Sequence, residues 1–349
     1  MQVIKLGGSV LTRESIENNI IKLIREAREP SVLVVSALRG ITDFLAASLA
    51  DRSVFTEPDR VAERLINPYR ELAERHLGEP EILRRFMLAA ERERTLFIRK
   101  AQSRTHDTRA YCLSSGERLS ALLVAGLVLE HSGGAADTQG LPCLFPEDTA
   151  SFAKQLFCNN KVSDSEARMN RPAVLRKALL AKLQVNPLIV FPGFYAVDTH
   201  RNFVLFGRGG SDYSAIAVAS ALKTGCVLCK DTGTFLSADP SLISRTKAVA
   251  YISYREAASL AKGGAKIIHR GAIALAKKHR IPLFIADAGG NISTMVRDAE
   301  KPDCSIKSIS ARSVRNLAEL SIVGEGITRE STFVVEALQS LFAQSIIPR

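Results

Sequence analysis

Two glycine-rich segments carry residue types that suit the binding of an anion. In KLGGS, residues 5–9, the backbone N–H groups of Gly7 and Gly8 can approach an anion because no Cβ stands in the way, and Lys5 adds a positive charge. The Walker phosphate-binding pattern places its lysine after the glycines, so this segment differs from it. Taken alone, KLGGS fits an anion-binding loop and a plain glycine turn about equally well.

The second segment, GRGGSDYSA at residues 207–215, directly precedes an amphipathic pattern that predicts a helix from Ser211. Its glycines, Arg208 and Asp212 therefore lie at a helix N-terminus, whose free N–H groups and partial positive charge attract anions. The alternative is a purely structural role, in which Asp212 only caps the first turn of the helix.

The elements that must position these segments alternate between short apolar runs and longer helical patterns. Strands are predicted at residues 2–6, 31–36, 187–191 and 225–229. Helices, in which apolar residues recur at spacings of three and four, are predicted at 14–27, 42–49, two or three times between 58 and 104, and at 117–129, 172–182, 211–222 and 254–262. This alternation predicts an α/β fold with a mainly parallel central sheet.

Composition limits the classes of protein to which the chain can belong. With 46% hydrophobic and 24% charged residues, it is an ordinary globular sequence rather than a disordered or collagenous one. The formal charge of +11 is compatible with a surface that binds nucleic acid or with a positive electrostatic potential that attracts small anions into a cleft. In the densest arginine cluster, residues 57–104, acidic residues are interleaved with the basic ones, which indicates solvated helix faces. We therefore expect no nucleic-acid partner.

The chain shows neither the pattern of a leader nor that of a metal site. Lys5 and two glycines interrupt the N-terminal apolar run, and we expect no stretch of about 18 apolar residues, so the sequence indicates a cytoplasmic protein without a membrane partner. Cys226 and Cys229 form a CxxC pair inside an apolar run, where a core strand is the better interpretation. No metal ligands are predicted.

The character of the sequence changes near its C-terminal end. Polar residues at 303–313 precede a strand pattern at 317–323, the segment GEG and a helical pattern at 332–343. We therefore predict two units, a catalytic domain at 1–307 and a small β-α segment at 308–349.

Five further segments join the two glycine segments in a recognisable order. They are VVSALRGITD at 34–43, SGERLSA at 115–121, PGF at 192–194, KDTGTFLSADP at 230–240 and GGAKIIH at 263–269. In order and spacing, residues 1–300 resemble the aspartokinases of the amino-acid kinase superfamily. The resemblance implies a three-layer amino-acid kinase fold. It also implies ATP-dependent phosphorylation of the L-aspartate side-chain carboxylate, with Mg²⁺, to 4-phospho-L-aspartate, the first step toward lysine, methionine and threonine.

The resemblance also assigns roles to individual residues. Lys5 would stabilise charge on the β,γ oxygens and Asp212 would orient it. Arg208 would bind the α-carboxylate of aspartate, and Glu117 would bind its ammonium group. For Glu117 the alternative is the start of a helix at the surface, because the SxGE sequence that ends in Glu117 also resembles a capping pattern. The other substrate-binding positions are Ser36, Thr42 and Ser211. The nucleotide-binding positions are Lys5, Gly7, Gly8, Ser9, Gly209, Gly210, Lys230, Asp231, Leu236 and Lys266.

The nucleotide side departs from the family pattern. Residues 232–234 replace its Val-Asp-Gly step, Leu236 stands at an aromatic position, and Ser241 replaces an arginine. Because of these departures, a weakly active or non-catalytic regulatory relative is one alternative. Another is a kinase for a different carboxylate such as acetylglutamate, against which Glu117 argues because an N-acetylated substrate has no ammonium group.

From Ser308, the C-terminal segment resembles the opening half of the regulatory ACT region that follows aspartokinase catalytic domains. The resemblance implies a homodimer, weakened here because only half of an ACT unit is recognisable.

Overall fold

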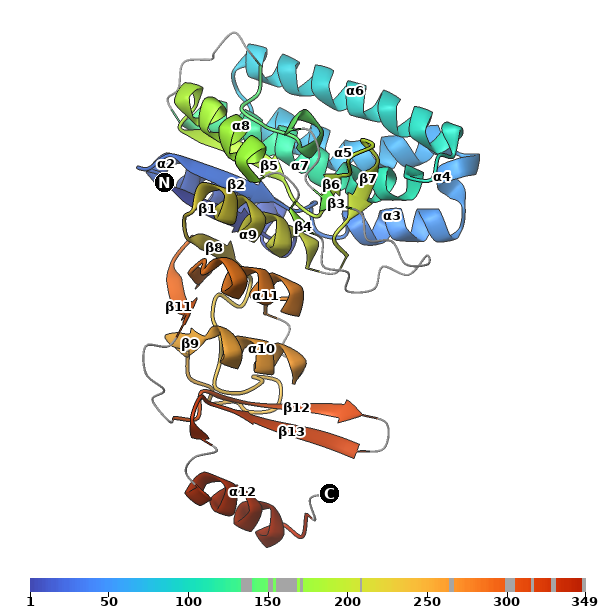
Figure 1. Ribbon diagram of the computed structural model, residues 1–349. Helices are drawn as coiled ribbons and strands as arrows, with labels where there is room; N and C mark the ends of the chain where they lie inside the picture. The colour runs from blue at the N-terminus through green and yellow to red at the C-terminus, as the bar shows by residue number, and fades with distance from the viewer. Residues whose placement is uncertain are drawn as a thin grey trace.

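A seven-stranded sheet forms the centre of the protein (Figure 1). The computed structural model describes residues 1–132, 140–149, 153–154, 168–169, 172–207, 209–263, 267–298, 305–314, 317–327 and 331–346. The strands are β1 (Gln2–Leu6), β2 (Ser31–Val35), β5 (Leu188–Pro192), β8 (Cys226–Cys229), β9 (Tyr251–Ser253), β10 (Leu283–Ala286) and β11 (Ile292–Arg297). They lie in the order β5-β2-β1-β8-β10-β11-β9, and only the β10–β11 pair is antiparallel.

One face of the sheet is covered by the N-terminal helices. These are α1 (Arg13–Ser15), the π-helical segment η1 (Ile16–Ile20), α2 (Ile21–Glu26), α3 (Ile41–Ala50), α4 (Ser53–Thr56), α5 (Pro58–His76), α6 (Pro80–Ser103) and α7 (Thr108–His131). Ile4, Leu6 and Leu33 belong to the apolar core on this side. The alternation of side chains along a strand sends Val3 and Val32 into a second core on the opposite face.

The opposite face is covered by α8 (Pro172–Val185), α9 (Gly210–Leu222), α10 (Tyr254–Lys262) and α11 (Arg270–His279). The three-layer α/β fold with a mainly parallel sheet is therefore confirmed. The strand expected at 225–229 is β8, and both Cys226 and Cys229 are fully buried in it, so this CxxC pair lies in a core strand.

Helix α7 runs through the middle of the first helical layer. It begins at Thr108, nine residues before the predicted start at Glu117, and nearly all of its side chains are buried. It corrects our expectation that no segment is apolar enough to span a membrane, because its length and its mean hydropathy of 1.4 reach that level. Every residue of that apolar stretch is buried inside the protein, so α7 is a core helix.

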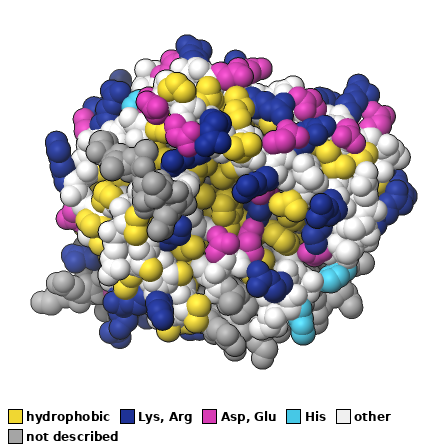
Figure 2. All heavy atoms as spheres, turned by 90° about the horizontal axis from the view of Figure 1, so that it is seen from above, with side chains coloured by type: hydrophobic (Ala, Val, Ile, Leu, Met, Phe, Trp, Pro, Cys, Tyr) yellow, Lys and Arg dark blue, Asp and Glu magenta, His cyan; other side chains and the backbone are white. Residues whose placement is uncertain are grey.

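The arginine-rich segment 57–104 forms α5 and α6, whose exposed faces carry paired charges. Arg60 contacts Glu57 at 2.9 Å and Arg84 contacts Glu81 at 2.7 Å, each within one helix. Figure 2 shows basic and acidic side chains interleaved over this side of the molecule. The predicted local pairing is confirmed, and such exposed pairs each contribute little to stability.

Smaller elements flank the main sheet. They are the strand pairs β3 (Ala153–Lys154) with β4 (Arg168–Met169) and β6 (Tyr195–Val197) with β7 (Phe203–Leu205), and the 3₁₀ turn η2 (Pro146–Thr149). The C-terminal part holds the antiparallel pair β12 (Ser308–Val314) and β13 (Leu317–Val323), followed by α12 (Ser331–Ala343). In Figure 1, α12 lies at the end of the molecule opposite α6.

The C-terminal strand and helix agree with the predicted β-α segment, and part of the polar stretch 303–313 adds a strand, β12, that was not predicted. The hairpin docks onto the body of the protein: the Ile309 N–H donates to the Ser237 carbonyl at 2.8 Å, and the Glu325 N–H donates to Glu256 at 2.6 Å. Val323 of β13 is buried in the second core. The boundary at residue 307 and the likeness to half an ACT unit stay predictions.

Candidate active site

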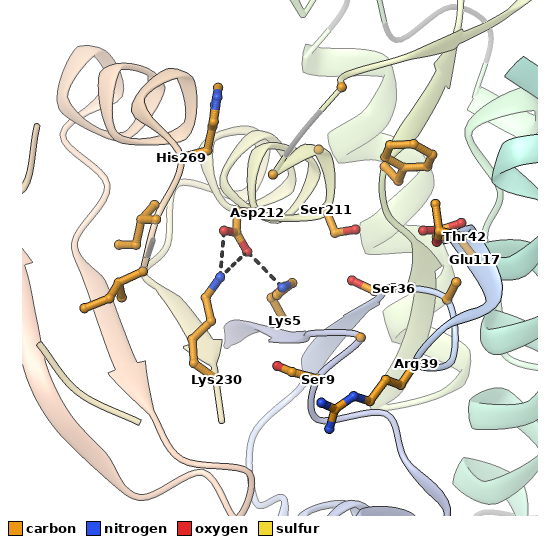
Figure 3. Close-up of a pocket in the computed structure, with 18 of the residues that line it drawn as sticks. Lys5, Ser9, Ser36, Arg39, Thr42, Glu117, Ser211, Asp212, Lys230 and His269 are labelled. Carbon is orange, nitrogen blue, oxygen red and sulfur yellow. Dashed lines mark hydrogen bonds and ion pairs between the residues drawn. The ribbon is translucent and has the colours of Figure 1, made fainter. Parts of the chain in front are cut away.

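A pocket opens where the carboxyl ends of β1, β2 and β8 meet (Figure 3). Parallel sheets commonly bind ligands at this edge, because the loops that follow adjacent strands converge there. The pocket is lined by Lys5, Gly8, Ser9, residues 36–40, Thr42, Asp43, Glu117, Phe194, Gly207, residues 209–212, Lys230, Ala261 and residues 267–270.

Three charged side chains form the centre of the pocket. The Lys5 ammonium contacts Asp212 Oδ1 at 2.9 Å, and the Lys230 ammonium contacts Asp212 Oδ1 and Oδ2 at 2.9 and 2.7 Å. The side chains come from the end of β1, the first turn of α9 and the residue that follows β8. The contact expected between Lys5 and Asp212 is therefore present, and Lys230 shares the same carboxylate.

Burial makes this cluster electrostatically strong. Lys5 and Asp212 are only 6% and 4% exposed. Burial alone would raise the pKa of Asp212, but the positive charges of Lys5 and Lys230 lower it to about 2. Burial and the neighbouring charge of Lys5 lower the pKa of Lys230 from its usual range. Two cations on one carboxylate leave a net charge of about +1, which is suited to an anionic ligand.

The KLGGS loop packs closely against the segment that follows β2. A Cβ on Gly8 would lie 3.2 Å from the Ala37 carbonyl oxygen, and a Cβ on Gly7 would lie 2.8 Å from Lys5 Nζ. The Val10 and Leu11 N–H groups donate to the Gly7 carbonyl. The absence of a Cβ at Gly7 leaves room for the Lys5 ammonium, and the absence of a Cβ at Gly8 lets the two loops pack closely. An exposed glycine turn would require neither.

The second glycine segment is tightly packed as well. Gly209 has φ +72°, and a Cβ there would lie 2.4 Å from His269 Cβ. His269 is the N-cap residue of α11, and its Nδ1 accepts a hydrogen bond from the Gly271 N–H at 3.2 Å. Gly193 of the PGF segment would, with a Cβ, meet Ser211 at 2.9 Å. These contacts bring the start of α9 to the pocket wall.

Glu117 lies in the pocket as a buried carboxylate. It belongs to the middle of α7 and is 3% exposed, so the alternative of a surface helix start is wrong. Its Oε2 has no hydrogen-bond partner among the residues that the structure describes. Burial raises the pKa of Glu117 to about 8, against the opposing effects of nearby backbone hydrogen bonds and of Lys5. A ligand with a positive charge would stabilise the ionised form.

The helix that carries Glu117 is held against the loop after β2. The hydroxyl of buried Tyr69 donates to the Gly116 carbonyl at 2.8 Å and accepts from the Leu38 N–H at 3.2 Å. A Cβ on Gly116 would lie 2.7 Å from Ala37 Cβ and 2.9 Å from Ile41 Cγ2. The absence of a side chain at Gly116 lets both walls of the pocket approach.

Replacing Gly116 by alanine is expected to push these walls apart. We expect a loss of about 1–3 kcal/mol in the free energy of unfolding, measured by urea denaturation, because the new methyl group overlaps two fixed neighbours. Gly126→Ala in the same helix is the control, since its methyl group would meet only the movable end of Leu77 at 3.0 Å. Equal losses in both variants would contradict the close approach at Gly116.

Arg118, the next residue after Glu117 in the sequence, forms a buried ion cluster that was not predicted. Its guanidinium donates to both oxygens of Glu93, at 2.6 and 2.7 Å, and also contacts Glu147 and the Tyr195 hydroxyl. The guanidinium also lies within 6 Å of the rings of Tyr111, Phe145, Tyr195 and Phe203. The cluster ties α6, α7, η2 and β6 together.

Most of the predicted site residues come together in the pocket. These are Lys5, Gly8, Ser9, Ser36, Thr42, Glu117, Gly209, Gly210, Ser211, Asp212 and Lys230, whose individual roles stay predictions. Gly7 does not line the pocket but lies close to the end of the Lys5 side chain. Arg208 and Lys266 lie outside the residues that the structure describes. Arg39, Asp43 and Arg270 also line the pocket and were not predicted, although the first two belong to the VVSALRGITD segment.

Besides Gly7, two described residues that were predicted to bind the nucleotide do not line the pocket. Asp231 is exposed, and Leu236 forms a β-bridge with Ala248 while its carbonyl accepts a hydrogen bond from Ser308 at 2.7 Å. Ser241 bonds to Asp239. The segment that departs from the family pattern is thus joined to the C-terminal hairpin.

The fold and the pocket define the class of the protein, and residues 1–287 match the amino acid kinase family. The chain belongs to this family. Within it, the predicted resemblance to aspartokinases is confirmed: the chain is 27% identical to lysine-sensitive aspartokinase 3 of Escherichia coli over 304 residues, and 27% identical to the aspartokinase of Chlamydia pneumoniae over 346 residues. These matches cover 83% and 96% of this chain and 63% and 72% of the relatives.

A solved structure supports the same placement. Escherichia coli aspartokinase III in complex with lysine and aspartate superimposes with a TM-score of 0.68 and 25% identity, over 89% of this chain and 68% of that one.

Proposed function

We propose that the protein phosphorylates the side-chain carboxylate of L-aspartate with ATP, and so acts in the cytoplasm at the first step toward lysine, methionine and threonine. The observation that carries the proposal is a single pocket that joins a buried cationic cluster between two glycine segments to the buried carboxylate of Glu117, whose Oε2 has no hydrogen-bond partner among the described residues. The similarity to a structure that binds aspartate supports this choice of amino acid.

The transfer itself asks little covalent chemistry of the protein. An oxygen of the substrate carboxylate attacks the terminal phosphorus of ATP, the bond from that phosphorus to the β,γ-bridging oxygen breaks, and ADP leaves. The carboxylate is already ionised, so no general base is required. Catalysis then rests on positioning and on stabilising charge at the transferred phosphoryl group.

Lys5 would provide that stabilisation. Asp212 fixes its ammonium from the side of α9, so little reorganisation accompanies the reaction. The backbone N–H groups of Gly8 and Ser9 and the start of α9 lie on the same pocket and would hold phosphate oxygens. Lys230 adds a second cation on the same carboxylate.

Mg²⁺ normally accompanies ATP and neutralises its phosphates. Among the residues that the structure describes, no three His, Cys, Asp or Glu side chains form a metal-binding group. The donor set therefore fits a cation that is held mainly by triphosphate oxygens and water rather than by a protein cage.

Recognition of aspartate requires both signs of charge in a small volume. Glu117 would pair with the ammonium group, while the hydroxyls of Ser36, Thr42 and Ser211 line the same pocket and can bind carboxylate oxygens. Arg208 stays our prediction for the α-carboxylate. The test is to compare ADP formation with L-aspartate and with N-acetyl-L-glutamate. Aspartate-dependent turnover is expected, and turnover with the acetylated substrate alone would contradict the proposal.

Glu117→Gln is expected to raise the KM for aspartate by roughly ten- to a hundredfold, because a charged hydrogen bond is worth about 1.5–3 kcal/mol. In the unsubstituted protein Glu117 is mostly protonated below its pKa of about 8, so ionisation should lower the aspartate KM about fivefold from pH 7 to pH 8.

Steady-state kinetics at both pH values measure this effect, and the dependence should vanish in Glu117→Gln. An unchanged aspartate KM in the variant, or a KM that rises with pH in the unsubstituted protein, would remove Glu117 from the substrate site.

A further inference from the structure

Arg39 is a cation of the pocket that the proposed mechanism leaves unused. The described part of the pocket contains four cationic side chains, from Lys5, Arg39, Lys230 and Arg270. Lys5 and Lys230 are buried and share Asp212. Arg39 is exposed, and its guanidinium makes no hydrogen bond or ion pair with any residue that the structure describes.

The backbone of Arg39 is nevertheless firmly placed. Its N–H donates to the Leu11 carbonyl at 3.2 Å, which ties it to the loop that begins with KLGGS. On one side, the Leu38 N–H donates to the Tyr69 hydroxyl; on the other, Gly40 has φ +87° and directly precedes α3. The backbone end of the side chain is thus fixed next to the glycine loop, while its guanidinium has no partner among the described residues.

The direction of the side chain matches this placement. Figure 3 shows Arg39 and Ser9 on the same side of the pocket, away from Glu117 and across Lys5 from His269. The packing of Gly8 against the Ala37 carbonyl confirms that the two loops adjoin. The Arg39 side chain therefore lies on the side of Ser9 and the glycine loop rather than on the side of Glu117, the carboxylate proposed to bind the amino acid.

On the basis of the proposed kinase function, we propose that Arg39 is a further nucleotide-binding residue, which contacts the phosphate groups of ATP bound at the KLGGS loop. A planar guanidinium binds phosphate oxygens through two parallel N–H bonds. Because Arg39 has no competing partner among the described residues, binding a phosphate breaks no existing ion pair. Lys5 and Lys230, by contrast, already share the charge of Asp212.

Arg39→Gln in the full chain tests the assignment. Isothermal titration with a non-hydrolysable ATP analogue should give a dissociation constant raised about tenfold, as expected for a lost charged hydrogen bond, with the KM for aspartate within about twofold of its original value. Arg39→Lys should recover part of the lost affinity, because lysine keeps the positive charge but cannot donate two parallel hydrogen bonds. Arg109→Gln on α7, exposed and outside the pocket lining, removes the same charge elsewhere and should change neither quantity.

The assignment is overturned if Arg39→Gln binds the analogue as tightly as the unsubstituted protein, if Arg109→Gln loses affinity equally, or if only the aspartate KM rises. The last result would move Arg39 to the amino-acid side. Failure of the proposed function is a separate outcome: the unsubstituted protein would then bind the analogue without forming ADP in the presence of aspartate, and the titrations would still decide the role of Arg39.

Discussion

Lys5→Ala is expected to lower kcat for aspartate phosphorylation by about a hundred- to a thousandfold, with a smaller change in either KM. A charge that acts mainly on the moving phosphoryl group stabilises the transition state more than the bound substrates. Removal of one preorganised electrostatic group costs about 3–4 kcal/mol in comparable sites. In this protein the group is preorganised because Asp212 holds the ammonium at 2.9 Å in a buried setting.

The variant should remain folded, since Asp212 keeps Lys230 as its partner. Far-ultraviolet circular dichroism and the urea midpoint provide that control. Steady-state kinetics with both substrates varied measure the effect. If kcat stays within about threefold of the original value in a folded variant, Lys5 does not stabilise the transition state.

Arg118→Met should produce the largest loss of stability, about 3–5 kcal/mol in the free energy of unfolding. The substitution leaves the carboxylates of Glu93 and Glu147 without the guanidinium that neutralises them, and a buried charge without its partner is strongly destabilising. Arg118 is 5% exposed and Glu93 is 8% exposed, so water cannot replace the lost contacts.

Arg94→Met on α6 is the matched control. Arg94 also contacts several acidic residues, of which Asp59 and Glu91 are half or more exposed and Glu63 is 44% exposed. Ion pairs of that kind contribute about 0–1 kcal/mol. Urea denaturation of both variants measures the difference. Comparable losses would show that burial of the Arg118 cluster has little energetic consequence.

The strongest sequence patterns predicted their elements closely. The helix over Tyr254–Lys262 and the strands at 2–6 and 317–323 have the expected bounds, because each is bordered by polar or glycine residues that end the apolar pattern. Helix α7 was predicted too short. Ser114, Ser115 and Gly116 are weak helix formers, and only burial of the whole segment in the core overrides that preference.

Other elements were missed for identifiable reasons. β9 is only three residues long, and β10 and β11 pair through contacts that no local pattern reveals. The polar composition of Ser308–Val314 hid β12, which is stabilised by pairing with β13 and by its contact with Ser237.

The parts of the candidate site that belong to sequence motifs could be predicted. The contacts between segments that are distant in the sequence could not. The contact of Lys5 with Asp212 followed from the family pattern, whereas the pairing of Lys230 with the same carboxylate required the structure. The partners of Arg118 lie 25 to 77 positions away from it in the sequence. No local sequence pattern could therefore predict this cluster. Leu236 matched a nucleotide-binding position by order alone, but it pairs with Ala248 instead of lining the pocket.

The most direct test of the proposed activity is to trap its product. The purified full chain is incubated with ATP, Mg²⁺, L-aspartate and hydroxylamine, which converts an acyl phosphate into a coloured hydroxamate in the presence of iron. We expect aspartate hydroxamate to form in step with ADP, and to be abolished when L-aspartate is omitted and strongly reduced in Lys5→Ala. ADP formation without any hydroxamate, or no turnover of either substrate by the folded protein, would contradict aspartate kinase activity.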